Sequence, residues 1–359
     1  MHRRPAVCTV PDAVHRAAAR SPCCRAPLAS RRGRTSARGA AGRCGSVGPG
    51  ACHDPLVRWT APPDQTGRTV LVTGATSGLG LASARALAAA GARVLLGVRD
   101  PVRGARALAS VPGGEVVELD LADLESVRRA AADVRERTGD ALHVLVNNAG
   151  IMGVPPTVTV DGFESQIATN HLGPAALTWL LMPALRGAGG ARVVTVSSLA
   201  HRGGGLDPDD LHFARRPYTG SRAYSASKLA NLLFAAELDR RLRAAGDDVI
   251  SVAAHPGLSG TELLLHSVRR RPGAAVLLPL ARALNAVVTQ PAARGALPQL
   301  HAATAPDVRG GDYTGPGGPG ETRGHPAPAR RSAAARDVDL ARRLWDATAA
   351  ETGVDPDPA

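Results

Sequence analysis

The chain almost lacks lysine and has few aromatic side chains. Lysine and arginine together account for 43 of its 359 residues, and Lys228 is the only lysine among them. Aromatic residues make up 3% of the chain, whereas hydrophobic residues make up 44%. A buried core must therefore consist mainly of alanine, valine and leucine. No apolar run reaches the roughly 18 residues that a membrane-spanning helix requires, so the sequence predicts no such helix.

Cysteine is absent from most of the chain. The five cysteines all precede residue 53, namely Cys8, Cys23, Cys24, Cys44 and Cys52. Their absence downstream excludes disulfides there, which is typical of a reducing cytoplasm, and we expect a cytoplasmic protein. The spacing contains no paired C-x-x-C or H-x-x-x-H pattern, so no metal site is expected.

The excess positive charge lies mostly in residues 1–56, which carry ten arginines and two aspartates, or +8 of the total of +12. This leader has no apolar periodicity, so we expect it to be disordered. It resembles a transit peptide, and a nucleic-acid-binding arm is a second interpretation. The simplest one is an extension upstream of a native start near Val57, which N-terminal sequencing would test. Because the charge belongs to the leader, no nucleic-acid partner is expected for the rest.

Short apolar runs alternate with helical patterns from residue 68 onward. Continuous apolar strands that alternate with helices indicate a parallel sheet covered on both faces. We therefore predict a single α/β domain over 57–355, a Rossmann-type doubly wound sheet of about seven strands. The strands expected from the pattern are 68–73, 92–98, 115–119, 141–147, 191–197 and 248–254. The helices expected between them are 79–91, about 101–110, 123–138, one ending near 185, and 221–245.

A glycine-rich turn, TGATSGLG at 73–80, joins the first strand directly to a helix. Gly74 permits a tight turn, Gly78 lets the backbone approach a pyrophosphate, and Gly80 allows the helix to pack closely on the strand. The helix N-terminus then faces the anion. The position of this turn in the first strand–helix unit predicts a dinucleotide-binding loop, with Ser77 and Leu79 as further contacts.

Five motifs in order resemble those of the short-chain dehydrogenase/reductase family. They are TGATSGLG at 73–80, NNAG at 147–150, VSS at 196–198, YSASK at 224–228 and HPG at 255–257. The resemblance covers about 66–350 and implies an oxidoreductase that transfers a hydride between a nicotinamide and a carbonyl or alcohol carbon. Details such as VSSLAHRGG and the C-terminal tail are most similar to the retinol-dehydrogenase-like branch.

The resemblance also implies a set of cofactor contacts. Asp120 would bind the adenine amino group and Leu121 would pack on the ring, while Asn147 would tie the central strand together. Ala149 and Gly150 would leave room for the ribose. Pro256, Gly257 and Thr261 match the loop on the nicotinamide side, with Thr261 next to the carboxamide.

The cofactor preference depends on GVRD at 97–100, where the second strand ends. An acidic residue about twenty positions after the glycine loop takes the ribose hydroxyls of NAD, whereas an arginine meets the 2′-phosphate of NADP. Arg99 favours NADP(H) over NAD(H), although adjacent Asp100 argues for NAD. The position before Gly78 is Ser77, so the basic residue that many NADP users carry there is absent.

Tyr224 and Lys228 are four residues apart on a predicted helix, so their side chains share one face. A free tyrosine has a pKa of about 10, and a nearby ammonium moves that pKa toward neutrality. The resemblance makes Tyr224 the general acid/base, with Ser198 polarising the substrate oxygen. Ser197 is the alternative to Ser198. Lys228 would bond the nicotinamide ribose and, with a water held by Asn170, resupply the proton.

The substrate is the least specified feature. The family's variable lid falls at about 262–298, and its stretch AAVLLPLARAL fits either a lipophilic substrate or a helix that completes the core. Contact of this segment with a membrane surface stays open, as does the choice between a monomer and a homodimer. We expect a small to medium lipophilic carbonyl or alcohol. The alternative is a non-catalytic NADP(H)-sensing regulator on the same fold. A serine hydrolase is excluded by the absence of a G-x-S-x-G motif.

Overall fold

The fold is taken from a computed structural model that describes residues 59–258 and 290–358. Three earlier predictions therefore lie outside the described residues: the leader at 1–56, Thr261, and the segment 262–289 of the expected lid. The remaining lid residues, from 290 to 298, form a short helix and the start of another. These helices pack beside the first helix of the fold, so this part of the expected lid belongs to a layer of the domain.

Within the described residues the strands form one eight-stranded sheet in the order β3-β2-β1-β4-β5-β6-β7-β8. Strands β1 to β7 run parallel, and β8 pairs antiparallel with β7. The predicted Rossmann-type parallel sheet is confirmed, with one strand more than expected. The strand bounds are β1 Thr69–Thr73, β2 Arg93–Val98, β3 Glu115–Glu118, β4 Val144–Asn147, β5 Arg192–Val196, β6 Ile250–Ala254, β7 Tyr313–Pro316 and β8 Pro326–Pro328.

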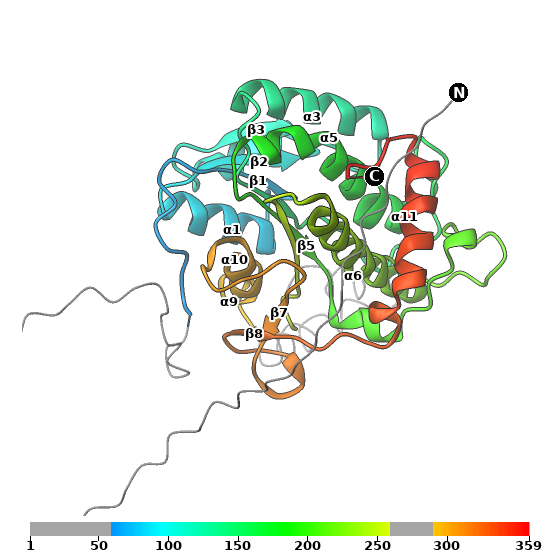
Figure 1. Cartoon of the computed structure of the whole chain (residues 1–359). Helices are drawn as coiled ribbons and strands as arrows, with labels where there is room; N and C mark the ends of the chain where they lie inside the picture. Colours follow the sequence, from blue (N-terminus) through cyan, green and yellow to red (C-terminus); the bar gives the residue numbers. More distant parts are fainter. Residues whose placement is uncertain (1–58, 259–289, 359) are drawn as a thin grey trace, which may run out of the picture. The chain divides into compact units, whose positions relative to one another are not determined.

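Helices connect the strands and cover both faces of the sheet (Figure 1). The α-helices are α1 Gly78–Ala89, α2 Pro101–Leu108, α3 Leu124–Thr138, α4 Ser165–Ile167, α5 Gly173–Gly187, α6 Gly220–Ala245, α9 Ala292–Gly295, α10 Leu297–Thr304 and α11 Val338–Thr352. A π-helical turn, η1 Ala168–Leu172, joins α4 to α5. The shorter 3-10 turns are η2 Leu199–Gly203, η3 Pro208–Asp210, η4 Pro319–Glu321 and η5 Ala334–Arg336.

Successive strand residues belong to two separate cores, one on each face of the sheet. On β1, Leu71 belongs to the core shared with α3, α5, α6 and α11, whereas Val70 and Val72 belong to the core shared with α1 and α10. This alternation follows from the pleat, which points neighbouring side chains to opposite faces. Both faces are covered, which is why the strands read as continuous apolar runs.

The strand order reverses direction at β1, which pairs with β2 on one side and β4 on the other. In open parallel sheets a ligand binds at such a point, beyond the carboxyl ends of the strands. Among the described residues, no helix is long and apolar enough to cross a membrane. The same residues contain no group of His, Cys, Asp and Glu side chains arranged to hold a metal ion.

Candidate active site

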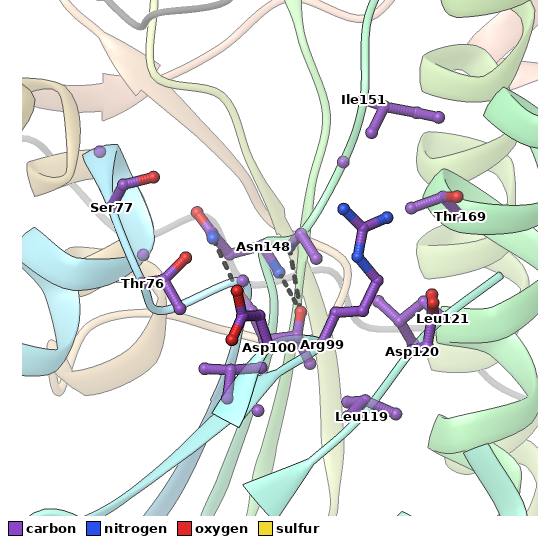
Figure 2. Close-up of a pocket in the computed structure, with 18 of the residues that line it drawn as sticks. Thr76, Ser77, Arg99, Asp100, Leu119, Asp120, Leu121, Asn148, Ile151 and Thr169 are labelled. Atoms are coloured by element: carbon purple, nitrogen blue, oxygen red, sulfur yellow. Dashed lines mark hydrogen bonds between the residues drawn. The ribbon is translucent and has the colours of Figure 1, made fainter. Parts of the chain in front are cut away.

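A cleft of about 760 Å³ opens at this point, beyond the carboxyl ends of β1 to β4. Its walls are four segments, namely 73–80, 97–103, 119–121 and 148–154, together with Thr169. Figure 2 shows these segments converging around the space into which Arg99 extends. Ten of the predicted cofactor contacts line the cleft: Gly74, Ser77, Gly78, Leu79, Gly80, Arg99, Asp120, Leu121, Ala149 and Gly150.

The glycine turn has the geometry of a phosphate cradle. Gly74 and Gly78 have positive φ of 69° and 55°, which L side chains rarely adopt. A Cβ added at Gly80 would lie 2.4 Å from the carbonyl oxygen of Gly74, so only glycine fits there. Helix α1 begins at Gly78 with Ser77 as its N-cap, and both residues line the cleft. The unpaired N–H groups of this first turn therefore face a space suited to a pyrophosphate.

Two arginines stand at the end of β2. Arg99 is exposed and its guanidinium extends into the space between Asn148 and Thr169 (Figure 2). Arg103, in the first turn of α2, lines the same cleft. Between them, Asp100 caps α2, and its Oδ1 accepts hydrogen bonds from the backbone amides of Val102 (2.9 Å) and Arg103 (3.1 Å). One oxygen of the Asp100 carboxylate is thus engaged by the helix, and Asp100 lines the cleft together with the two arginines.

The two asparagines of NNAG point to different sides. Asn147 does not line the cleft, because its Nδ2 donates to Thr178 Oγ1 of α5 at 2.9 Å. Asn148 lines it, and its Nδ2 donates to the carbonyl of Thr73 at 2.8 Å. The same Asn148 amide nitrogen would be 2.6 Å from a Cβ at Gly80. Asn148 therefore holds the glycine turn against β4, a role that the sequence interpretation did not assign.

Tyr224 and Lys228 lie on one face of α6, as predicted. The Lys228 side chain is 4% exposed, and its Nζ donates to the carbonyl of Val196 at 3.1 Å. Nζ lies 5.8 Å from the centre of the Tyr224 ring. A Cβ added at Gly150 would be 3.4 Å from Nζ and 3.0 Å from Asn170 Oδ1. The lysine and the asparagine therefore converge behind a glycine that lines the cleft.

The two serines of VSS have separate partners. Ser197 is buried and its Oγ donates to the carbonyl of Lys228 at 2.7 Å, which anchors α6 to the end of β5. Ser198 is the N-cap of η2, with Oγ accepting from the amide of Ala200 at 3.2 Å, and it hydrogen-bonds Tyr224. Ser198 is thus the serine that contacts the tyrosine, and its role as the catalytic serine in place of Ser197 stays a prediction.

Asn170 lies in the π-helical turn η1 and is 1% exposed. Its Oδ1 accepts from the amide of Ile151 at 2.8 Å, and its Nδ2 donates to the carbonyl of Ile151 at 2.9 Å. The same Nδ2 donates to Ser227 Oγ at 2.9 Å, and Ser227 Oγ donates to the carbonyl of Tyr224 at 2.8 Å. Asn170 therefore joins the cleft wall to α6. π-Turns of this kind are frequent at functional sites.

Burial dominates the ionisation of both residues on α6. It raises the pKa of Tyr224, and the hydrogen bond with Ser198 lowers it in part. Burial also lowers the pKa of Lys228 to about 8. The sequence interpretation expected the ammonium to move the tyrosine's pKa downward. The direction differs because the ammonium lies beside the ring and bonds a carbonyl, while the phenol is removed from water.

The structure describes the loop after β6 as far as Leu258, and these described residues do not line the cleft. Gly257 has φ of 67°, and a Cβ there would be 2.3 Å from the carbonyl oxygen of Thr322. The Pro256 carbonyl accepts from Gln290 Nε2 at 2.9 Å. Pro256 and Gly257 thus shape the turn through contacts with later segments. Thr261, which the resemblance puts next to the carboxamide, lies outside the described residues.

Sequence reasoning missed several residues that line the cleft: Arg103, Asn148, Ile151, Met152, Val154 and Thr169. A usable signal existed for Arg103. Asp100 followed by Pro101 is a typical N-cap and first helical position, which puts Arg103 in the first turn beside Arg99. The apolar side chains at 151–154 follow NNAG directly and had no motif of their own.

Comparison with known proteins agrees with this geometry. The family model described as short chain dehydrogenase matches residues 68–271. Mouse polyprenol dehydrogenase is 41% identical over 295 residues, covering 79% of this chain and 83% of that protein. Human retinol dehydrogenase 13 is 36% identical over 295 residues, covering 80% and 86%.

Solved structures are similar as well. A crystal structure of an uncharacterized Mycobacterium paratuberculosis protein has 44% identity and a TM-score of 0.70, covering 84% of this chain and 99% of that one. The RhlG/NADP active-site complex of Pseudomonas aeruginosa has 25% identity and a TM-score of 0.53, covering 70% and 94%. With the cradle, the sheet order and these matches together, the chain belongs to the short-chain dehydrogenase family, in its retinol-dehydrogenase-like branch, and is an NAD(P)-dependent oxidoreductase.

Proposed function

We propose that the protein is an NADP(H)-preferring enzyme that interconverts a lipophilic carbonyl compound and its alcohol, with Tyr224 as general acid/base. The observation that carries this proposal is the grouping of Tyr224 with Ser198 and Lys228, where Lys228 and Asn170 lie directly behind Gly150 of the cleft wall. A non-catalytic NADP(H)-sensing regulator would need the cradle but would have no use for this buried group.

The residues present fit a dinucleotide. The glycine turn and the start of α1 would hold the pyrophosphate, while Asp120 and Leu121 would contact the adenine. Gly150 leaves open the space in front of Lys228 Nζ, where a ribose hydroxyl would be bonded. When bound, the nicotinamide supplies or accepts the hydride.

Three observations support NADP(H) over NAD(H). Arg99 and Arg103 both line the cleft at the end of β2, where the 2′-substituent of the adenosine ribose would lie. The Asp100 carboxylate, which would otherwise favour NAD, caps α2. Two guanidinium groups suit a phosphate better than a pair of ribose hydroxyls. The similar RhlG structure is described as an NADP complex.

The protein's own groups supply the proton chemistry. In the reductive direction the Ser198 hydroxyl donates to the substrate oxygen, and Tyr224 transfers its phenolic proton there as negative charge develops. Burial raises the pKa of Tyr224, which keeps that proton in place at neutral pH. Lys228, whose pKa is about 8, then returns a proton with the help of a water held near Asn170. Alcohol oxidation reverses these steps.

The lipophilic substrate class has two supports. Ile151, Met152 and Val154 line the cleft directly after Gly150, the residue next to Lys228 Nζ and Asn170. Relatives with 41% and 36% identity are named for polyprenol and retinol, and both compounds are isoprenoid alcohols. We therefore propose an isoprenoid or similar lipophilic aldehyde, ketone or alcohol.

A substrate panel tests this function. Purified enzyme is incubated with retinal, farnesal, decanal and a polar sugar aldehyde, each with NADPH or NADH, and nicotinamide absorbance is followed. We expect turnover of the lipophilic carbonyls, faster with NADPH. Tight NADPH binding without turnover of any carbonyl or alcohol would instead favour the regulator.

A further inference from the structure

The turn that carries Ser198 is tied to the C-terminal part of the chain through a buried histidine. His201, in η2, is 1% exposed. One ring nitrogen, Nδ1, lies 2.7 Å from the carbonyl oxygen of Ser198. The other, Nε2, accepts a hydrogen bond of 3.3 Å from the backbone amide of Ser332. His201 thus joins the end of β5 to a segment that lies more than a hundred residues later in the chain.

The second contact determines the tautomer of the ring. A backbone amide can only donate, so Nε2 must be the acceptor and Nδ1 must carry the proton. Nδ1–H then donates to the Ser198 carbonyl, which also accepts from the backbone amide of His201 at 3.1 Å. Two donors from one residue therefore fix the carbonyl of Ser198. That restrains the orientation of the serine whose hydroxyl contacts Tyr224.

The surroundings keep the His201 ring neutral and fix its orientation. Burial lowers the pKa of His201, and Arg202 and Arg331 act in the same direction, whereas the Ser198 carbonyl and Glu321 act against it. The ring also packs edge-on against Tyr313 of β7, with centroids 5.9 Å apart and planes at 82°. In a protonated ring Nε2 would carry a hydrogen that points at the N–H of Ser332. Two donors would then face each other, which disfavours the protonated form of His201 further.

A second contact joins η2 to the C-terminal part of the chain, this time at Glu321. Arg202 Nη2 donates to Glu321 Oε2 at 2.7 Å, and His255 Nε2 lies 3.2 Å from that same oxygen. Glu321 has a positive φ of 58°, an uncommon conformation for a residue with a side chain. Strained backbone of this sort tends to occur where geometry serves a site. The segment thus holds η2 at two neighbouring residues.

We infer that His201 is a positioning residue that sets the orientation of Ser198 toward the reacting oxygen, through its Nδ1–H bond to the serine carbonyl. The inference rests on the proposed role of Ser198. His201 acts through Ser198, because its two ring nitrogens are engaged by the carbonyl of Ser198 and the backbone amide of Ser332. Removing that bond should slow turnover without weakening cofactor binding.

Two substitutions separate the two ring contacts. The amide nitrogen of asparagine can take the place of Nδ1, so His201→Asn keeps a donor for Ser198 and loses the contact with Ser332. The longer His201→Gln reaches the place of Nε2, so it keeps an acceptor for Ser332 and loses the donor to Ser198. We expect kcat to fall about 10- to 100-fold in His201→Gln and less than about threefold in His201→Asn. KM for NADPH should stay unchanged in both.

The control is His143→Gln. His143 Nδ1 accepts from the amide of Thr69 at 3.0 Å, at the opposite, amino ends of the strands. The His143→Gln substitution should lower the melting temperature without changing kcat. Equal losses of kcat in His201→Asn and His201→Gln, or losses that only follow stability, would overturn the inference. Should either variant fail to fold, ¹⁵N NMR of histidine-labelled wild-type enzyme decides, since an Nε2–H tautomer at His201 contradicts it.

The kcat values of Ser198→Ala and Tyr224→Phe are measured alongside those of the His201 variants. These measurements distinguish a failure of the proposed function from a failure of the positioning role of His201. Normal turnover in these variants would overturn the proposed function whatever His201 does. A large loss in both, together with indistinguishable His201 variants, would leave the function standing and reject the positioning role.

Discussion

Lys228 Nζ lies 5.8 Å from the centre of the Tyr224 ring and donates a hydrogen bond to the carbonyl of Val196 at the end of β5. The single lysine of the chain therefore bridges the helix that carries the tyrosine and the strand that leads to Ser198. Its small head fits a space bounded by Gly150 and Asn170. These contacts explain why an ammonium is kept in a chain otherwise rich in arginine.

Lys228→Arg should reduce kcat by about 100-fold or more, although the positive charge is retained. The larger guanidinium has to displace Gly150 or Asn170, and overpacking of this kind costs about 1–3 kcal/mol. Steady-state kinetics with NADPH measure the loss. Arg129→Lys is the control, because Arg129 is 63% exposed and forms only surface ion pairs. Wild-type turnover in Lys228→Arg would show that shape does not matter at this position.

Arg103→Ala should lower kcat/KM for NADPH about tenfold and leave that for NADH nearly unchanged, since a contact to a phosphate is lost. Arg99→Ala should act in the same way, and the two together more strongly. Arg106→Ala is the matched control, because Arg106 is an exposed arginine on the same helix that does not line the cleft. Equal effects on the two cofactors would speak against binding of the 2′-phosphate by these arginines.

The reductive rate should fall as pH rises through about 8. Burial lowers the pKa of Lys228 to about 8, so the ammonium that resupplies Tyr224 is present below this pH and lost above it. The pKa of Tyr224 is raised, so the phenol itself keeps its proton over this range. The kcat for carbonyl reduction is measured from about pH 6 to pH 10. A flat profile up to pH 10 would contradict the role of Lys228.

Trp345→Ala should destabilise the fold and spare cofactor binding. Trp345 of α11 packs on Trp179 of α5 and on Phe234 of α6, with ring centroids 4.9 Å and 5.5 Å away. Removing a buried tryptophan costs about 3–5 kcal/mol, and we expect the melting temperature to drop by at least about 5 °C. Val338→Ala on the same helix, at a 47% exposed position, should change it little. Weaker NADPH binding in folded Trp345→Ala would be contrary to this assignment, because none of these aromatic residues lines the cleft.

The sheet and the cradle could be predicted because local patterns determine them. Apolar runs between helical segments indicate a parallel sheet, and the glycines at 74, 78 and 80 occupy positions where a side chain is strained or excluded. The pairing of Tyr224 with Lys228 follows from helical spacing alone. In each case the relevant neighbours lie within a few residues along the chain.

Other features depend on contacts that no local pattern shows. Both faces of the sheet are buried, so alternation does not tell which of Asn147 and Asn148 faces the cleft. Strand β8 has the sequence Pro-Ala-Pro, which is tolerated only at a sheet edge such as the one it occupies. The His201 bridge to Ser332 joins residues 131 positions apart. The raised pKa of Tyr224 is a consequence of burial.

The most direct test of the account is Tyr224→Phe, which removes one hydroxyl and keeps the ring. NADPH binding, followed by nucleotide fluorescence, should stay within about twofold of wild type because the substitution leaves the glycine turn, Arg99 and Arg103 unchanged. Turnover of a lipophilic aldehyde should fall by at least about 100-fold, the size expected for loss of a general acid. Near-normal turnover in Tyr224→Phe would contradict the assignment of Tyr224 as the proton donor.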